Sequence, residues 1–308
     1  MERAELGLTK GLAAYEAGRW DEAATYLGHY LSIKQQDTDI LIKYARSQIR
    51  CKPFKRERLA QAVNAYRAVL RNEKNPQAAK EVIEIYLKFN MPAEAEFVAR
   101  NFVADDQSGQ FRQMLADSLF KQRKYEEAVE ILSDLVSQKP DQVMAFKLLG
   151  EIEARRSDVN EMSVQQWFDK AVEKNPTSAQ AYILRSSYFA KAGYFEKASQ
   201  DLENAEKCDI SKTGIQLGLA AGWLNLFEFD KARKHLEVVR EMDPSNESLW
   251  YVWATLAVKT NKIDEMLWVA EKGLFSLGSN DYAFLPIATE LFVRASDLLQ
   301  AEKCIEKL

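Results

Sequence analysis

The feature that most constrains the fold of this chain is a motif that returns about every 34 residues. In "AGRWDEAATYL", Gly18 is followed by Trp20 and then by Ala23. The stretch "AGYFEKASQDL" at 192–202 repeats this order. The residue that closes the motif, here called the repeat landmark, recurs at intervals of 33 to 39 residues as Ala23, Ala62, Ala95, Ala128, Val164, Ala198, Ala232, Met266 and Ala301. Such a period along a whole chain indicates a stack of like units that share one continuous core.

Each period contains two helix-like apolar patterns. In "AQAYILRSSYFAKAG" the pattern is Tyr182, Ser186 and Phe189, at positions i, i+4 and i+7 of one helix face. A second face follows at 195–205. The 308 residues include only 12 glycines and 7 prolines, and no stretch alternates strand-forming with polar residues. The sequence therefore predicts an all-α chain with short loops.

Glycine and proline mark where these helices end. Gly18 and Gly193 follow the first helix of a period, where a left-handed backbone is needed and glycine adopts it with least strain. Asn90 and Asn261 occupy the equivalent point and are the next most tolerant type. The prolines that follow second helices are Pro76, Pro140, Pro176 and Pro244. The Asn, Asp and Ser residues beside them are expected to cap the next helix.

With this period and this helix–turn–helix order, the chain resembles the tetratricopeptide repeat family. The resemblance covers essentially the whole sequence and implies an α-solenoid, a right-handed superhelix of stacked antiparallel helix pairs that forms a single domain over 1–308. The expected repeats are 4–37, 38–75, 76–108, 109–142, 143–178, 179–212, 213–246, 247–281 and 282–308. The second and fifth repeats depart from the pattern, because their turns at 50–58 and 155–163 are longer.

The resemblance also implies a binding site, because in this family the first helices line a concave groove that holds a peptide or a partner helix. The candidate groove residues are Lys80, Glu84, Lys88, Asp117, Lys121, Lys147, Glu151, Arg155, Lys191, Leu217, Leu224, Tyr251, Val258 and Lys259. Some members grip a chaperone tail with groove asparagines. Asn225 is the only asparagine on this face, so that clamp is disfavoured here.

Basic residues recur along this face, seven positions before the repeat landmark. They are Lys88, Lys121, Lys191, Lys259 and Arg294, with Arg50 and Arg155 expected at the same place in the two longer repeats. A basic ridge of this kind fits an acidic or phosphorylated peptide. Alternatively, each cation stabilises the last turn of its helix through the macrodipole. We favour the second interpretation, because Glu84, Asp117 and Glu151 interleave with the cations.

The C-terminal third is rich in tryptophan. Four of the six tryptophans are Trp223, Trp250, Trp253 and Trp268. An apolar partner helix could dock near them. Three of them, Trp223, Trp250 and Trp253, fall on positions that the repeat itself buries, and packing is therefore the favoured explanation.

The sequence does not support catalysis. Its two histidines, His29 and His235, are expected on exposed surfaces of second helices. Phosphate-loop, dinucleotide, zinc-protease and nucleophile-elbow motifs are all missing. Adjacent carboxylates such as Glu126 and Glu127 do not face each other on a helix. We expect no enzyme activity, no cofactor and no metal site.

The leading interpretation is a non-catalytic scaffold or adaptor for protein or peptide partners. A helical-repeat nucleic-acid binder is the alternative from another class, although a net charge of −4 argues against it. A third possibility is the substrate-recruiting arm of a larger multidomain enzyme. The chain stops inside the second helix of its ninth repeat without a polar capping helix. This is expected of a fragment of a longer protein, of a dimer, or of a last helix that caps itself, and we favour the fragment.

The expected location is the cytoplasm. Cys51, Cys208 and Cys304 are an odd number of widely spaced cysteines, a pattern that indicates buried thiols in a reducing compartment. The longest apolar run, at 217–227, is too short to span a bilayer. The first ten residues lack the apolar core of a signal peptide.

Overall fold

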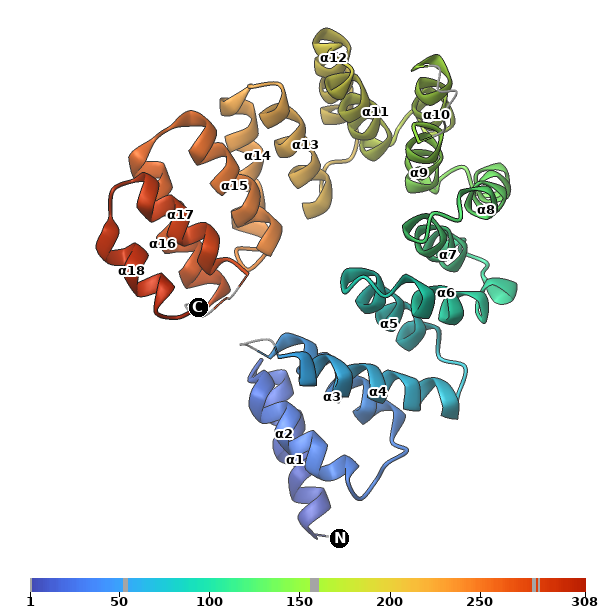
Figure 1. Cartoon of the computed structure of the whole chain (residues 1–308), viewed down its shortest axis with the longest axis vertical. Coiled ribbons are helices and arrows are strands. Elements are labelled where there is room, and N and C mark those ends of the chain that lie inside the picture. Colours follow the sequence, from blue (N-terminus) through green and yellow to red (C-terminus); the bar gives the residue numbers. More distant parts are fainter. Residues whose placement is uncertain (1, 52–54, 156–160, 279–280, 282) are drawn as a thin grey trace. The chain divides into compact units, whose positions relative to one another are not determined.

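The computed structural model describes residues 2–51, 55–155, 161–278, 281 and 283–308. Over these residues the chain forms eighteen α-helices and one short 3-10 helix and has no strand, which confirms the all-α prediction (Figure 1). The helices of the first half are α1 (Glu2–Glu16), α2 (Trp20–Leu31), α3 (Thr38–Arg50), α4 (Arg56–Asn72), α5 (Pro76–Lys88), α6 (Pro92–Arg100), η1 (Val103–Asp105), α7 (Gln110–Lys121) and α8 (Tyr125–Gln138). Those of the second half are α9 (Val143–Glu153), α10 (Glu161–Lys174), α11 (Ala179–Lys191), α12 (Phe195–Glu206), α13 (Thr213–Asn225), α14 (Phe229–Met242), α15 (Glu247–Thr260), α16 (Ile263–Leu277), α17 (Leu285–Arg294) and α18 (Leu298–Ile305).

The helices come in pairs joined by tight turns, and one pair corresponds to each predicted repeat. Figure 1 shows α1 and α2 packed side by side in this way. Two or three residues join the helices of most pairs, but five separate α3 from α4 and seven separate α9 from α10. These are the two repeats whose turns are predicted to be longer. Residues 52–54 and 156–160 of those turns lie outside the described residues.

The repeat landmark is buried in every pair. The exposed fractions are 0% for Ala23, Ala62, Ala95, Ala128, Ala198 and Ala232, 1% for Met266, 3% for Ala301 and 7% for Val164. A small side chain at this position lets the second helix approach its neighbours closely, and burial of apolar surface then stabilises the stack by roughly 25 cal/mol per Å². The periodicity of the sequence is therefore the periodicity of the core.

The turn within a pair uses one recurring backbone conformation. Five residues before the landmark, φ is positive at Gly18 (69°), Asn90 (56°), Arg123 (62°), Gly193 (81°), Phe227 (61°), Asn261 (51°) and Ser296 (62°). The predicted left-handed role of the two glycines and two asparagines is thus confirmed. At Gly18 the chain closes with Arg19 N donating to Ala14 O at 2.9 Å, the hydrogen bond that completes a Schellman motif.

Caps define the other ends of several helices. The Asn75 side chain accepts a hydrogen bond from Ala78 N at 2.9 Å, and Pro76 is the first residue of α5. Asn246 caps α15 in the same way through Leu249 N at 3.4 Å. Ser178 precedes α11 without a side-chain cap bond. The predicted capping therefore holds for Asn75 and Asn246 and not for Ser178.

The chain divides into two compact units, residues 1–128 and 129–308, with the boundary inside α8. In the second unit Trp223, Trp250 and Trp253 are 0%, 1% and 3% exposed. The prediction that these three tryptophans serve packing is confirmed. A single domain of nine repeats with superhelical form stays a prediction.

Candidate partner-binding groove

Side chains from the first helices of three successive repeats enclose a cavity of about 430 Å³ in the first unit. Tyr15 belongs to α1. Arg46 and Arg50 belong to α3, and Glu84 and Lys88 belong to α5. The other lining residues are Ile49, Tyr66, Glu81, Ile85 and Phe89. This space, called the first-helix cavity below, brings two predicted groove residues together with side chains of two other repeats.

A half-buried ion pair forms part of the cavity wall. Arg46 Nε donates to Glu81 Oε2 at 2.9 Å, and Arg46 Nη2 donates to Glu81 Oε1 at 2.5 Å. Tyr66 and Gln77 donate to the same carboxylate at 2.6 and 2.5 Å. Burial alone would raise the pKa of Glu81, but these hydrogen bonds outweigh burial and lower the pKa to about 2. The two charges therefore neutralise each other and hold α3 against α5.

The remaining charges of the cavity are accessible. Lys88 and Glu84 are both exposed, and within the described part of the chain neither makes a hydrogen bond or an ion pair. The Arg50 guanidinium lies over the Trp20 ring, 4.7 Å from its centroid. Two cations and one carboxylate thus remain available to a ligand, next to the apolar side chains of the same cavity.

Basic residues occupy the last turn of most first helices. They are Arg50, Lys88, Lys121, Lys191, Lys259 and Arg294. Arg155 instead lies two residues beyond α9, and its Nη1 donates to the carbonyl oxygen of Glu151 at 2.7 Å. Cations at these points satisfy or complement the terminal carbonyl groups of a helix. Their positions match the helix-stabilising interpretation.

The predicted groove residues differ in accessibility. Those that are exposed are Glu84, Lys88, Lys121, Arg155, Lys191 and Lys259. Those that are half-buried are Lys80, Asp117, Lys147, Glu151, Leu217, Tyr251 and Val258. Glu84 and Lys88 line the first-helix cavity, whereas Lys147 pairs along α9 with Glu151 at 3.7 Å.

Leu224 differs from the prediction. It is 4% exposed and belongs to the hydrophobic core of the second unit. Leu217 and Val258 are partly buried against the same core. Leu224 is therefore a packing residue that offers no surface to a partner.

His235 is also not where the sequence analysis expects it. It is 6% exposed; its Nδ1 lies 2.6 Å from Gln216 Oε1 and its Nε2 lies 3.2 Å from Glu206 Oε1. The reason is its register: His235 follows the landmark Ala232 by three residues and shares its buried face. His29 is exposed, as predicted.

Sequence reasoning missed Arg46, the residue that ties two repeats together at the cavity. The groove positions follow from a count back from the landmark, and the longer turn after α3 shifts that count in the second repeat. The signal that identifies Arg46 is the alignment of Arg50 with Lys88, because it places Arg46 opposite Glu84, one turn earlier on the groove face.

The described residues can also be compared with the sequence for membrane helices, metal sites and thiols. None of the described helices has the length and apolar character needed to cross a membrane. In the same ranges, no three His, Cys, Asp or Glu side chains are grouped to hold a metal ion. All three cysteines are free thiols; Cys51 and Cys304 are buried and Cys208 is half-buried. Burial raises the pKa of the Cys51 thiol to about 11, so this thiol is unreactive at neutral pH.

The chain is similar to several known proteins. A sequence model described as tetratricopeptide repeat matches residues 114–179, and no curated protein matches the chain. Yeast Tom70 is 13% identical with a TM-score of 0.49, covering 100% of this chain and 78% of its own. A thermophilic TPR protein of Thermus thermophilus is 18% identical with a TM-score of 0.46, covering 59% of this chain and 98% of its own.

The Cut9–Hcn1 hetero-tetramer of the APC/C is 12% identical and covers 99% of this chain and 65% of its own. Its TM-score of 0.50 shows a shared fold. Residues 114–179 therefore match the tetratricopeptide repeat family. The helix pairs and the buried landmarks of the other described residues have the same repeat architecture.

Proposed function

We propose that this protein is a non-catalytic scaffold that binds a peptide or a partner helix along its first helices. Proteins of this family are generally non-catalytic scaffolds for protein partners. The observation that carries the proposal is the first-helix cavity, to which α1, α3 and α5 all contribute. A cavity shared by three repeats gives an extended partner several contacts at once.

The chemistry of this cavity suits a segment of mixed character. An apolar side chain would lie beside Ile49 and Ile85, and a carboxylate would lie near Arg50 and Lys88. Glu84 would accept a hydrogen bond from a backbone or basic group of the partner. The fixed ion pair beneath needs no rearrangement when a ligand enters, which lowers the entropic cost of binding.

The same proposal includes the other predicted groove residues, with the exception of Leu224. They would extend the contact along the first helices of each unit. We further propose the cytoplasm as the compartment, because the three cysteines are free thiols.

The test is quantitative affinity capture of proteins from a nuclease-treated lysate of the source organism, using the full chain as bait. A double variant, Arg50→Glu with Lys88→Glu, should lose the captured partners. Lys272→Glu, an exposed lysine on the second helix α16, is the matched control and should retain them. Circular dichroism must first show equal helicity for all three proteins.

Retention of every partner by the double variant would contradict binding at this cavity. Partners that are captured from an untreated lysate but not from the nuclease-treated one would instead favour the nucleic-acid alternative.

A further inference from the structure

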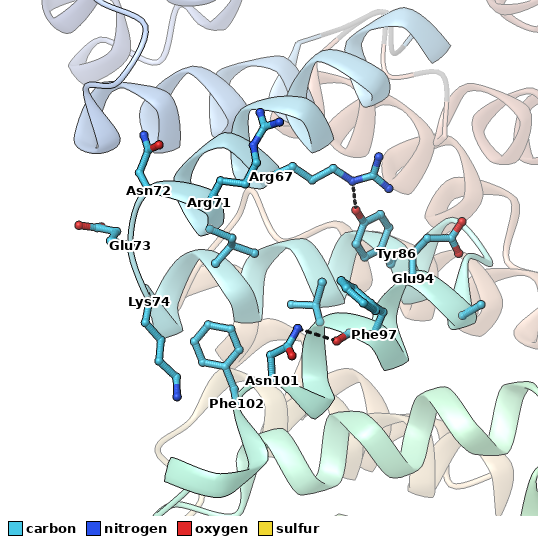
Figure 2. A pocket seen from close by; sticks show the side chains of 13 residues that line it. Arg67, Arg71, Asn72, Glu73, Lys74, Tyr86, Glu94, Phe97, Asn101 and Phe102 are labelled. Atoms are coloured by element: carbon cyan, nitrogen blue, oxygen red, sulfur yellow. Dashed lines mark hydrogen bonds between the residues drawn. The ribbon is translucent and has the colours of Figure 1, made fainter.

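A second and larger cavity lies between second helices of the first unit. It has a volume of about 1030 Å³, and it is lined by α4, by α6, by the segments that follow these two helices and by Tyr86 of α5 (Figure 2). It arises from a difference in helix length: α4 has 17 residues and α6 has 9, or about 25 Å against about 14 Å. Beyond the end of the shorter α6, Asn101 and Phe102 line the cavity on the way to η1. We call this space the second-helix cavity.

Phe97 gives the second-helix cavity an unusual apolar surface. Its side chain is 73% exposed, although it lines the cavity together with Leu70 and Phe102. Phe102 is only 6% exposed and stacks on Phe111 with ring centroids 5.0 Å apart. A fixed aromatic base with one open phenyl ring is typical of an anchor position for a partner side chain.

The α4 wall of the cavity is cationic. Arg67 Nε donates to the Tyr86 hydroxyl at 2.9 Å, a neutral acceptor that leaves the charge uncompensated (Figure 2). Arg71 is exposed and has no hydrogen bond or ion pair to any described residue. These two residues are at i and i+4, so they lie on one face of α4 about 6 Å apart along the axis.

The other charged groups of the cavity do not cancel this pair. Lys74 is paired with Asp105. Glu73 accepts a hydrogen bond from Asn75 and points outward, while Glu94 lies near Tyr86 at the end remote from Lys74 (Figure 2). Two guanidinium groups one turn apart, neither of which forms an ion pair with a described residue, therefore stand beside an open phenyl ring.

We propose that the second-helix cavity is a separate docking site for an amphipathic helix of a partner protein. Such a helix would place an apolar side chain on Phe97 and two carboxylates, one turn apart, on Arg67 and Arg71. The spacing of the cations matches the turn of a helix, and a helix in a groove presents its anchors with this period. Arginine also binds carboxylates through two parallel hydrogen bonds, which adds orientation to charge.

The experiment is a selection from a phage-displayed library of helical peptides of about five turns, with randomised faces, on the full chain. Selected helices should carry Asp or Glu one turn apart beside a large apolar residue. Phe97→Asp and Arg71→Glu should each weaken binding by at least about tenfold. Replacing by lysine only the peptide carboxylate that faces Arg71 should restore its binding to the Arg71→Glu variant.

The control is Lys88→Glu in the first-helix cavity, which should leave the affinity of the selected helices unchanged. This control separates the present site from the function proposed above. Failure to select any helix, selected helices without the acidic pair, or binding that survives Phe97→Asp would each overturn the proposal. The side chains of Phe97 and Arg71 are exposed, so the Phe97→Asp and Arg71→Glu variants should melt at the same temperature as the parent.

Discussion

At the scale of single residues, the turn position five residues before the landmark offers a direct test. Arg123 holds φ at 62° there, is exposed and lies in the tight turn after α7. The left-handed conformation costs a non-glycine residue roughly 1–2 kcal/mol, more than the entropy that glycine loses on folding. Arg123→Gly should therefore raise stability by about 0.5–1 kcal/mol, measured as the urea midpoint followed by circular dichroism.

The matched control is the reverse change at the first repeat. Gly18→Ala should lower the midpoint, because alanine acquires the strain that glycine avoids. A destabilised Arg123→Gly variant would mean that the arginine makes a compensating contribution in this turn.

Glu81 predicts a pH dependence. Its pKa in the folded chain, about 2, lies below its ordinary value of 4.5. Its stabilisation is therefore complete above pH 4.5 and is lost as the pH falls towards 2, with a total on the order of 2–3 kcal/mol. Glu81→Gln should be less stable than the parent at pH 7, and this difference should shrink between pH 5 and 2 in urea titrations.

Glu84→Gln is the matched control for that pH series. Glu84 is on the same helix but is exposed and unpaired in the described part of the chain, so its variant should stay close to the parent at every pH. An unchanged difference between the parent and Glu81→Gln across the series would contradict the role assigned to the ion pair.

Residue identity predicts this turn only in part. Glycine or asparagine at this position predicts a positive φ, and both residue types can be read from the sequence. Arg123, Phe227 and Ser296 adopt the same conformation although their types rarely do. At these three residues the packing of the two helices determines the backbone conformation, and the residue type does not predict it.

At the scale of elements, three helices meet at His235. Its ring joins α14 to Gln216 of α13 and to Glu206 of α12, which also accepts from Trp223 Nε1 at 2.7 Å. His235→Leu should lower stability by about 1–3 kcal/mol, because it leaves the Gln216 oxygen buried without a donor. Urea unfolding followed by circular dichroism would measure this loss.

His235→Gln provides the comparison for that variant. Glutamine retains a hydrogen-bond donor and should retain part of the stability. Equal loss in both variants would mean that the volume of the ring, not its hydrogen bonds, stabilises the junction.

Helix positions could be predicted well, because the period is regular and glycine, asparagine or proline marks many of the boundaries. Pro76 begins α5 and Asn75 caps it, as the sequence suggests. Contacts between repeats could not be predicted with the same certainty. The bidentate contact of Arg233 with Glu265 joins α14 to α16 across 32 positions, and no motif links these two residues.

At the scale of the molecule, stability should be local. Substantial contacts among the described helices join neighbours in the chain or next-but-one neighbours. Tyr66 of α4 is 1% exposed and contributes to these local contacts. Tyr66→Ala should cost on the order of 3 kcal/mol and increase amide hydrogen exchange in α3 to α6 but not in α13 to α16.

Trp223→Ala is the reciprocal experiment in the second unit. Amide hydrogen exchange should become faster in α12 to α15 and should stay unchanged in α1 to α4. Uniform acceleration over the whole chain in either variant would mean that the two units unfold as one cooperative body.

Because these contacts join helices that are close in the sequence, they also affect how the chain folds during translation. A helix pair such as α1 and α2 has nearly all the partners that it needs once the following repeat has been synthesised. A nascent chain of this kind can acquire structure from its amino end while the ribosome is still translating the rest. Codon changes that alter elongation speed should therefore affect the yield of folded protein less than they do for folds whose first and last segments must pair.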